Sequence, residues 1–159
     1  LEAGMCNYRD IIKEQFDLDM DNIPGSGAAG GLGTALMVFL NGTLKSGIET
    51  VLDLVDFDEH LKDVDIVVTG EGATDWQSVF GKVMQGVGVH CKKRHIPAVA
   101  IVGSMGSGAE DIFDYGIESI ITTVNNIMPL SDALNHAEEL YLGAARRMFR
   151  LLKAGMQMR

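Results

Sequence analysis

Two carboxylates, an amide, a hydroxyl and a lysine lie close together near the middle of the chain. They belong to Glu71, Asp75, Gln77, Ser78 and Lys82. Carboxylates can bind Mg²⁺ or accept a hydroxyl proton, and cationic groups can hold phosphates, so this segment has the parts that phosphoryl transfer requires. A simpler alternative stays open, in which Asp75 or Ser78 only caps the next helix.

A second candidate is a glycine-rich segment in which Gly25, Gly27 and Gly30 fit the spacing G-x-G-x-x-G. That motif binds dinucleotides when a strand precedes it, and the polar residues 17–24 do not predict a strand. A glycine-rich turn that leads into a helix can instead offer backbone N–H groups to an anion. The small residues could equally serve only close packing of that helix, so both interpretations stay open.

Gly103 and Ser104 begin a third candidate, a glycine–serine loop that runs to Gly108. Such a loop before a helix suits contact with a phosphate. It equally suits an ordinary turn between a strand and a helix, so by itself it indicates little. The single tryptophan, Trp76, could stack on an adenine ring or simply pack against the protein.

Three predicted strands and the helices around them must position these residues. The β-branched and apolar runs 65–69, 98–102 and 119–124 predict buried strands. The predicted helices cover 1–16, 28–40, 48–61, 78–93, 109–115 and a final segment with Ser131 as its N-cap. The last helix has one apolar stripe that should face the core, formed by Leu134, Ala137, Tyr141, Ala144, Met148 and Leu151.

Strands that alternate with helices predict an α/β fold, with a parallel sheet and helices packed on its faces. Right-handed crossovers bring the carboxyl ends of the strands to one edge. Ligands of α/β proteins bind at this edge. We therefore expect the loops 70–78, 103–108 and 125–129 to form a site.

The composition argues against several classes of function. The 159 residues carry a formal net charge of −9 without a strong basic cluster, so a nucleic-acid partner is not expected. No stretch approaches the roughly eighteen apolar residues of a membrane span, and no signal segment follows Leu1. Cys6 and Cys91 lie far apart without a metal-binding spacing, which fits a reducing cytoplasm.

Three segments together resemble the type-1 glycerate kinases, and the resemblance covers nearly the whole chain. The segment PGSGAAGGLG, with Gly25, Gly27, Gly30 and Gly31, resembles their glycine-rich segment, and TGEGATDWQSVFGK, with Asp75, Gln77, Ser78 and Lys82, resembles their signature TGEG-x-x-D-x-Q-[ST]-x-x-GK. The strand that ends at Gly103 is similar to the one before their second glycine turn. Ala73, Thr74 and Trp76 differ from the residues that the family often has.

The resemblance implies phosphorylation of D-glycerate with ATP and Mg²⁺, without fixing the residues that bind the metal. It implies that Asp75, Glu71 and Lys82 are the catalytic residues. The residues it implies for substrate or phosphate binding are Gly25, Gly27, Gly30, Gly31, Gly70, Gly72, Gln77, Ser78, Gly103 and Ser104.

Members of this family are more than twice as long and fold as two α/β domains with the active site between them. The resemblance implies that residues 1–61 are helices at the border with a missing N-terminal part, and that residues 62–159 form an incomplete Rossmann-like domain. We expect the chain to be inactive alone. Two alternatives remain, a dinucleotide-binding oxidoreductase module, which needs a strand before Gly25, and a non-catalytic α/β fragment.

Overall fold

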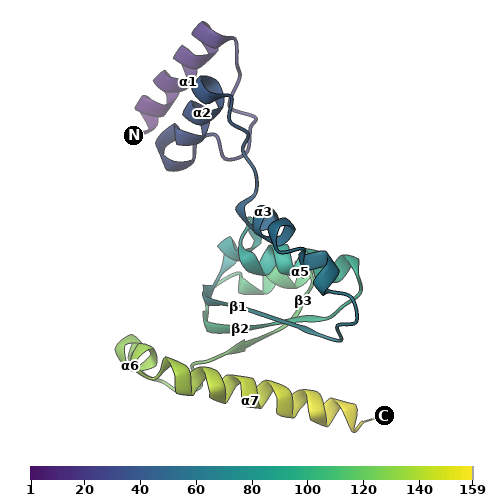
Figure 1. Ribbon diagram of the computed structural model, residues 1–159. Helices are drawn as coiled ribbons and strands as arrows, with labels where there is room; N and C mark the ends of the chain where they lie inside the picture. Colours follow the sequence, from purple (N-terminus) through teal and green to yellow (C-terminus); the bar gives the residue numbers. More distant parts are fainter. Residues whose placement is uncertain (159) are drawn as a thin grey trace. The chain divides into compact units, whose positions relative to one another are not determined.

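The computed structural model describes residues 1–158, which form two compact units (Figure 1). The first unit is Leu1–Ser46, and the second begins at Gly47. The expected division of the family fold into residues 1–61 and 62–159 stays a prediction. None of the described helices is both long and apolar enough to cross a membrane.

The first unit consists of two helices that agree with the predicted ones, α1 (Glu2–Phe16) and α2 (Ala28–Leu40). α1 ends at Asp17, which has a left-handed backbone conformation and donates its N–H to Lys13 O. Ile12 and Met20 are buried in this unit. Periodic apolar residues alone therefore located both helices.

The second unit contains a sheet and its helices. Its elements are α3 (Gly47–Leu54), α4 (Phe57–His60), β1 (Val67–Thr74), the 3-10 helix η1 (Trp76–Val79), α5 (Val83–Lys93), β2 (Ala98–Met105), the 3-10 helix η2 (Ala109–Tyr115), β3 (Ile117–Thr122), α6 (Leu130–Asn135) and α7 (Ala137–Met156). The predicted helix 48–61 is wrong in its continuity, because left-handed Asp56 (φ 48°) separates α3 from α4. Similar breaks divide the predicted helix 78–93 into η1 and α5, and the final helix into α6 and α7.

The three strands pair in parallel, as predicted, and their order in the sheet is β1-β2-β3. Val67 pairs with Ala98, and Ala98 pairs with Ile117, so the strands start nearly level. The predicted α/β fold with a parallel sheet is therefore confirmed. All three carboxyl ends lie at the same edge of the sheet, as right-handed crossovers require.

Helices cover both faces of the sheet, with α5 on one face and α7 on the other (Figure 1). Alternate residues of β2 point to opposite faces, so Ala100 packs in the α5 layer whereas Ile101 packs in the α7 layer. On α7 the buried residues are Ala144 and Met148, and Leu152 packs with them. The predicted stripe is wrong for four residues that the structure leaves exposed, Leu134, Ala137, Tyr141 and Leu151. Leu151 is exposed because the four-residue step from Met148 leads to Leu152.

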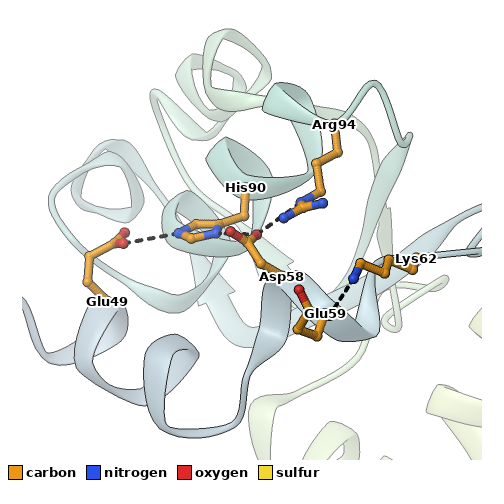
Figure 2. A network of polar contacts seen from close by, with 6 residues as sticks. All are labelled: Glu49, Asp58, Glu59, Lys62, His90 and Arg94. Atoms are coloured by element: carbon orange, nitrogen blue, oxygen red, sulfur yellow. Dashed lines mark hydrogen bonds and ion pairs between the residues drawn. The ribbon is translucent and has the colours of Figure 1, made fainter.

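Polar contacts of His90 fasten α3 and α4 to α5 (Figure 2). His90 Nδ1 lies 2.8 Å from Asp58 Oδ1, and His90 Nε2 lies 3.0 Å from Glu49 Oε2. Arg94 Nε donates to the same Asp58 oxygen at 3.2 Å, and the Phe57 ring contacts the imidazole edge-on. The hydrogen bond to Asp58, and the weaker one to Glu49, raise the pKa of His90 against its partial burial. The same bond, together with that to Arg94, lowers the pKa of Asp58 to about 2.

These shifts predict how the stability of the second unit depends on pH. The stabilisation from His90 is complete below its unfolded pKa of 6.5 and disappears as pH rises through the higher folded value. That from Asp58 is complete above 3.8 and disappears as pH falls toward about 2. His90→Gln should therefore cost on the order of 1 kcal/mol near pH 5.5 and less at pH 9, in chemical denaturation.

Lys62→Gln is the matched control for this prediction, since it removes the ion pair between Lys62 and Glu59 (Figure 2). Both side chains of this pair are largely exposed. Exposed pairs of this kind contribute about 0–1 kcal/mol. An equal cost of His90→Gln at both pH values would contradict the proposed charge state of His90.

Candidate active site

β1 and β2 continue past the ends predicted for them. The sequence predicts that β1 ends at Thr69 and β2 at Val102, whereas the structure extends β1 to Thr74 and β2 to Met105. Gly106 N donates to Thr74 O at 2.7 Å and prolongs the pairing. The prediction of a loop is therefore wrong for residues 70–74 and for 103–105, which lie in strands.

Two glycines permit this extension. A β carbon on Gly70 would lie 2.2 Å from Ile101 O, and one on Gly103 would lie 2.2 Å from Gly72 O. The two backbones approach too closely for a side chain at either position. Glycine has a low strand propensity, so the sequence pattern alone predicts a loop, whereas pairing with the neighbouring strand decides the structure.

The third strand is shorter than its neighbours. β3 ends at Thr122, which pairs with Val102. Beyond that pair only β1 and β2 continue, as a two-stranded ribbon of residues 72–74 and 103–105, which we call the β1–β2 extension. The predicted site residues Gly72, Gly103 and Ser104 lie in this extension.

A hollow of about 490 Å³ lies at the same edge of the sheet. It is lined by Val68, Thr69, Gly70, Glu71, Gly72, Ile101, Gly103, Thr123 and Tyr141. Four predicted site residues, Gly70, Glu71, Gly72 and Gly103, therefore share one concave surface. Sequence analysis missed Thr123 and Tyr141. Thr123 lies near the end of the predicted strand 119–124, and Tyr141 precedes Ala144 by about one helical turn. The available signal was that Thr123 is close to a predicted strand end.

Glu71 is half-buried and takes part in a chain of hydroxyl contacts. Ser78 Oγ donates to Glu71 Oε2 at 3.4 Å, and Thr74 Oγ1 donates to Ser78 Oγ at 3.0 Å. Thr74 and Ser78 are fully buried. Sequence analysis named Thr74 only as a difference from the family. Its hydroxyl lies four residues before that of Ser78, and this spacing could have suggested the contact between them.

Asp75 caps η1 in the way that the simpler alternative foresaw. Its Oδ1 accepts the N–H of Gln77 at 2.8 Å, and Ser78 Oγ accepts the N–H of Asp75 at 3.3 Å. This reciprocal pair is a capping box. The side chain of Asp75 is half-buried. Capping occupies one carboxylate oxygen with a backbone donor, so the second oxygen leaves capacity for a proton or a metal ion.

The other predicted side chains of this region are exposed. Gln77 and Lys82 lie in and after η1, and Ser104 lies in the β1–β2 extension. Lys82 is the residue before the first turn of α5. Trp76 contacts the ring of Phe80 edge-on at 5.9 Å between centroids, so it packs against the protein and keeps about half of its surface exposed.

The glycine-rich segment lies in the first unit. Gly27 is the N-cap of α2. Inside the first turn of α2, Ala29, Gly30 and Gly31 have left-handed backbone conformations, with φ of 51°, 68° and 86°. Gly31 also lies against Tyr8, whose ring would be 2.9 Å from an added β carbon. Residues 17–27 contain no strand. The structural condition for a dinucleotide motif is therefore not met.

Within residues 1–158, no three His, Cys, Asp or Glu side chains are grouped so that they could hold a metal ion by themselves. Mg²⁺ in kinases is usually bound by one or two carboxylates together with phosphates and water. Glu71 and Asp75, joined through Ser78, fit that smaller requirement.

The model of the glycerate kinase family matches residues 1–153. The chain belongs to the glycerate kinase family. It is 40% identical over 148 residues to a glycerate kinase of Halalkalibacterium halodurans, covering 93% of this chain and 39% of that protein. It is 38% identical over 157 residues to a glycerate 2-kinase of Escherichia coli, covering 99% and 41%.

A solved structure supports the same family. It is described as that of a glycerate kinase 2 from Salmonella typhimurium LT2, and the match has a TM-score of 0.68 and 36% identity, over 96% of this chain and 39% of that one. The chain thus spans about two fifths of the length of these relatives. The part matched by the family model includes the carboxyl ends of all three strands.

Proposed function

We propose that the full-length protein that carries this chain phosphorylates D-glycerate with ATP and forms a phosphoglycerate. Membership of the glycerate kinase family supports this proposal. The observation that carries it is the placement of two carboxylates, Glu71 and Asp75, at the carboxyl edge of a parallel sheet. The buried Ser78 hydroxyl donates to the Glu71 carboxylate and accepts the backbone N–H of Asp75. Ligands of α/β folds bind at this edge.

In the proposed reaction, a glycerate hydroxyl oxygen forms a bond to the γ-phosphorus, and the bond from that phosphorus to the bridging oxygen of ADP breaks. The hydroxyl proton passes to a carboxylate, for which we propose Asp75. Its cap bond to Gln77 N fixes the carboxylate, which keeps an oxygen available as the acceptor. Lys82 would balance the charge of the phosphates from the start of α5.

Magnesium would neutralise charge on the phosphates when it is bound. Glu71 and Asp75 are the two carboxylates of this edge that suit it. Gly70, Gly72, Gly103 and Ser104 would offer backbone and hydroxyl groups to the substrates, with Gln77 at the rim. The glycine-rich segment, Gly25, Gly27, Gly30 and Gly31, would line the cleft between the domains of the full-length protein. Both cysteines are free thiols, so we place this reaction in the cytoplasm.

The direct test is an assay of the full-length protein with ATP, Mg²⁺ and D-glycerate, followed by ³¹P NMR of the product. We expect a phosphoglycerate and ADP in equal amounts. The 159-residue chain should show no turnover under the same conditions, because the rest of the proposed cleft lies outside it. Turnover by the isolated chain would contradict its proposed fragment status, and a full-length protein without turnover would favour the non-catalytic alternative.

A further inference from the structure

We propose that Ser78 and Thr74 are positioning residues that hold the Glu71 carboxylate in place at the edge of the sheet, an inference that rests on the proposed function. The three side chains form one chain of contacts, from Thr74 Oγ1 through Ser78 Oγ to Glu71 Oε2. β1 supplies both Glu71 and Thr74, whereas η1 supplies Ser78.

The contacts of Ser78 leave its hydroxyl a single orientation. A serine hydroxyl has one proton to donate and two lone pairs that accept. Ser78 Oγ accepts from Thr74 Oγ1 at 3.0 Å and from Asp75 N at 3.3 Å. Since both acceptor sites are used, the hydroxyl proton is directed toward the carboxylate of Glu71. Among these three residues only Glu71 lines the hollow, and the chain of donors ends on its carboxylate.

Burial separates the two hydroxyls from any ligand. Thr74 and Ser78 are both 0% exposed, whereas Glu71 is half-buried. A ligand at the edge can touch Glu71 without touching either hydroxyl, so Ser78 acts behind the ligand-binding group rather than in it. Glutamate has a flexible side chain that must be fixed at an entropic cost, and a preformed donor reduces that cost when substrate binds.

A double-mutant cycle in the full-length enzyme tests this assignment. Ser78→Ala should lower kcat about 10–100-fold, as expected for a displaced catalytic group, with a smaller change in KM. In the Glu71→Ala background the same substitution should change kcat less than about twofold, because the group that it positions is gone. Equal effects in both backgrounds would overturn the proposal. Thr74→Val should also lower kcat, and Thr74→Ser, which keeps the hydroxyl, should recover most of that loss.

Two further measurements separate this inference from folding effects and from the proposed function. Loss of the capping bond should lower the unfolding midpoint equally with and without Glu71, so stability cannot produce the expected coupling in kcat. Crystal structures of the wild type and of Ser78→Ala should show Glu71 ordered in the first and displaced in the second. An unchanged Glu71 would overturn the positioning role even if the wild-type protein does not phosphorylate glycerate, a result that would itself refute the proposed function.

Discussion

Replacing Asp75 with asparagine in the full-length enzyme is expected to lower kcat about 10²–10⁴-fold, the usual loss when a general base is removed. Asparagine keeps a side-chain oxygen that can accept the N–H of Gln77, so the cap of η1 should survive. The substitution removes the negative charge and the proton acceptor. Steady-state kinetics with ATP and D-glycerate measure the effect.

Asp75→Ala separates the chemical role of this side chain from its structural one. Alanine removes both the charge and the cap, and a lost cap costs about 1 kcal/mol of stability. We expect the two variants to be similarly slow, but only Asp75→Ala to unfold at lower denaturant concentration. If Asp75→Asn keeps kcat within a few-fold of the wild type, Asp75 is a cap alone and the proton acceptor must be another group.

Replacing Gly70 with alanine is expected to destabilise the sheet by about 3 kcal/mol, at the upper end of the usual cost of overpacking. The added β carbon would lie 2.2 Å from the backbone oxygen of Ile101. A flexible side chain could move away, but this oxygen belongs to β2, so the pairing of β1 with β2 itself must shift. Urea denaturation followed by circular dichroism measures the loss.

Gly72→Ala is the matched control, because the structure places no atom within 4 Å of a β carbon at Gly72. It is in the same strand, two residues further along. We expect a change in unfolding free energy within about 0.5 kcal/mol, as for other open surface positions. Similar losses in both variants would mean that glycine flexibility, rather than the close approach of two strands, determines the stability here.

The parallel direction of the strands could be predicted from local pattern, whereas their order in the sheet is known from the structure. Runs such as Ile66–Thr69 and Ala98–Val102 are β-branched or small and apolar, and the helices between them leave parallel pairing as the short solution. The strand ends could not be predicted in this way. Gly70 and Gly103 have low strand propensity, and the hydrogen bonds that extend both strands come from the partner strand, which a single segment does not encode.

Helix interruptions were missed for a related reason. Asp56 and His136 are compatible with helical periodicity, but the backbone is left-handed at Asp56 and leaves the helical region at His136 (φ −110°, ψ 22°). Leu151 and Leu152 are equally apolar. Leu152 packs against the core because it follows Met148 by four residues, whereas Leu151 follows it by three and is exposed.

The candidate site could be predicted as a set of residue types and only partly as an arrangement. Glu71 and Asp75 follow from a carboxylate-rich segment at a strand tip. The burial of Thr74 and Ser78 depends on η1 folding back over the end of β1, which local sequence does not reveal. The motif resemblance implies that Ser78 binds substrate or phosphate, and this role stays a prediction. The hydrogen bonds place its buried hydroxyl between Thr74 and Glu71.

The β1–β2 extension also has a mechanical consequence. Beyond Val102 the sheet has two strands instead of three, and two-stranded ribbons twist more than the interior of a wider sheet. The apolar layers on both faces pack against the strands before this extension. We therefore expect the extension to be more strongly twisted than the three-stranded part of the sheet.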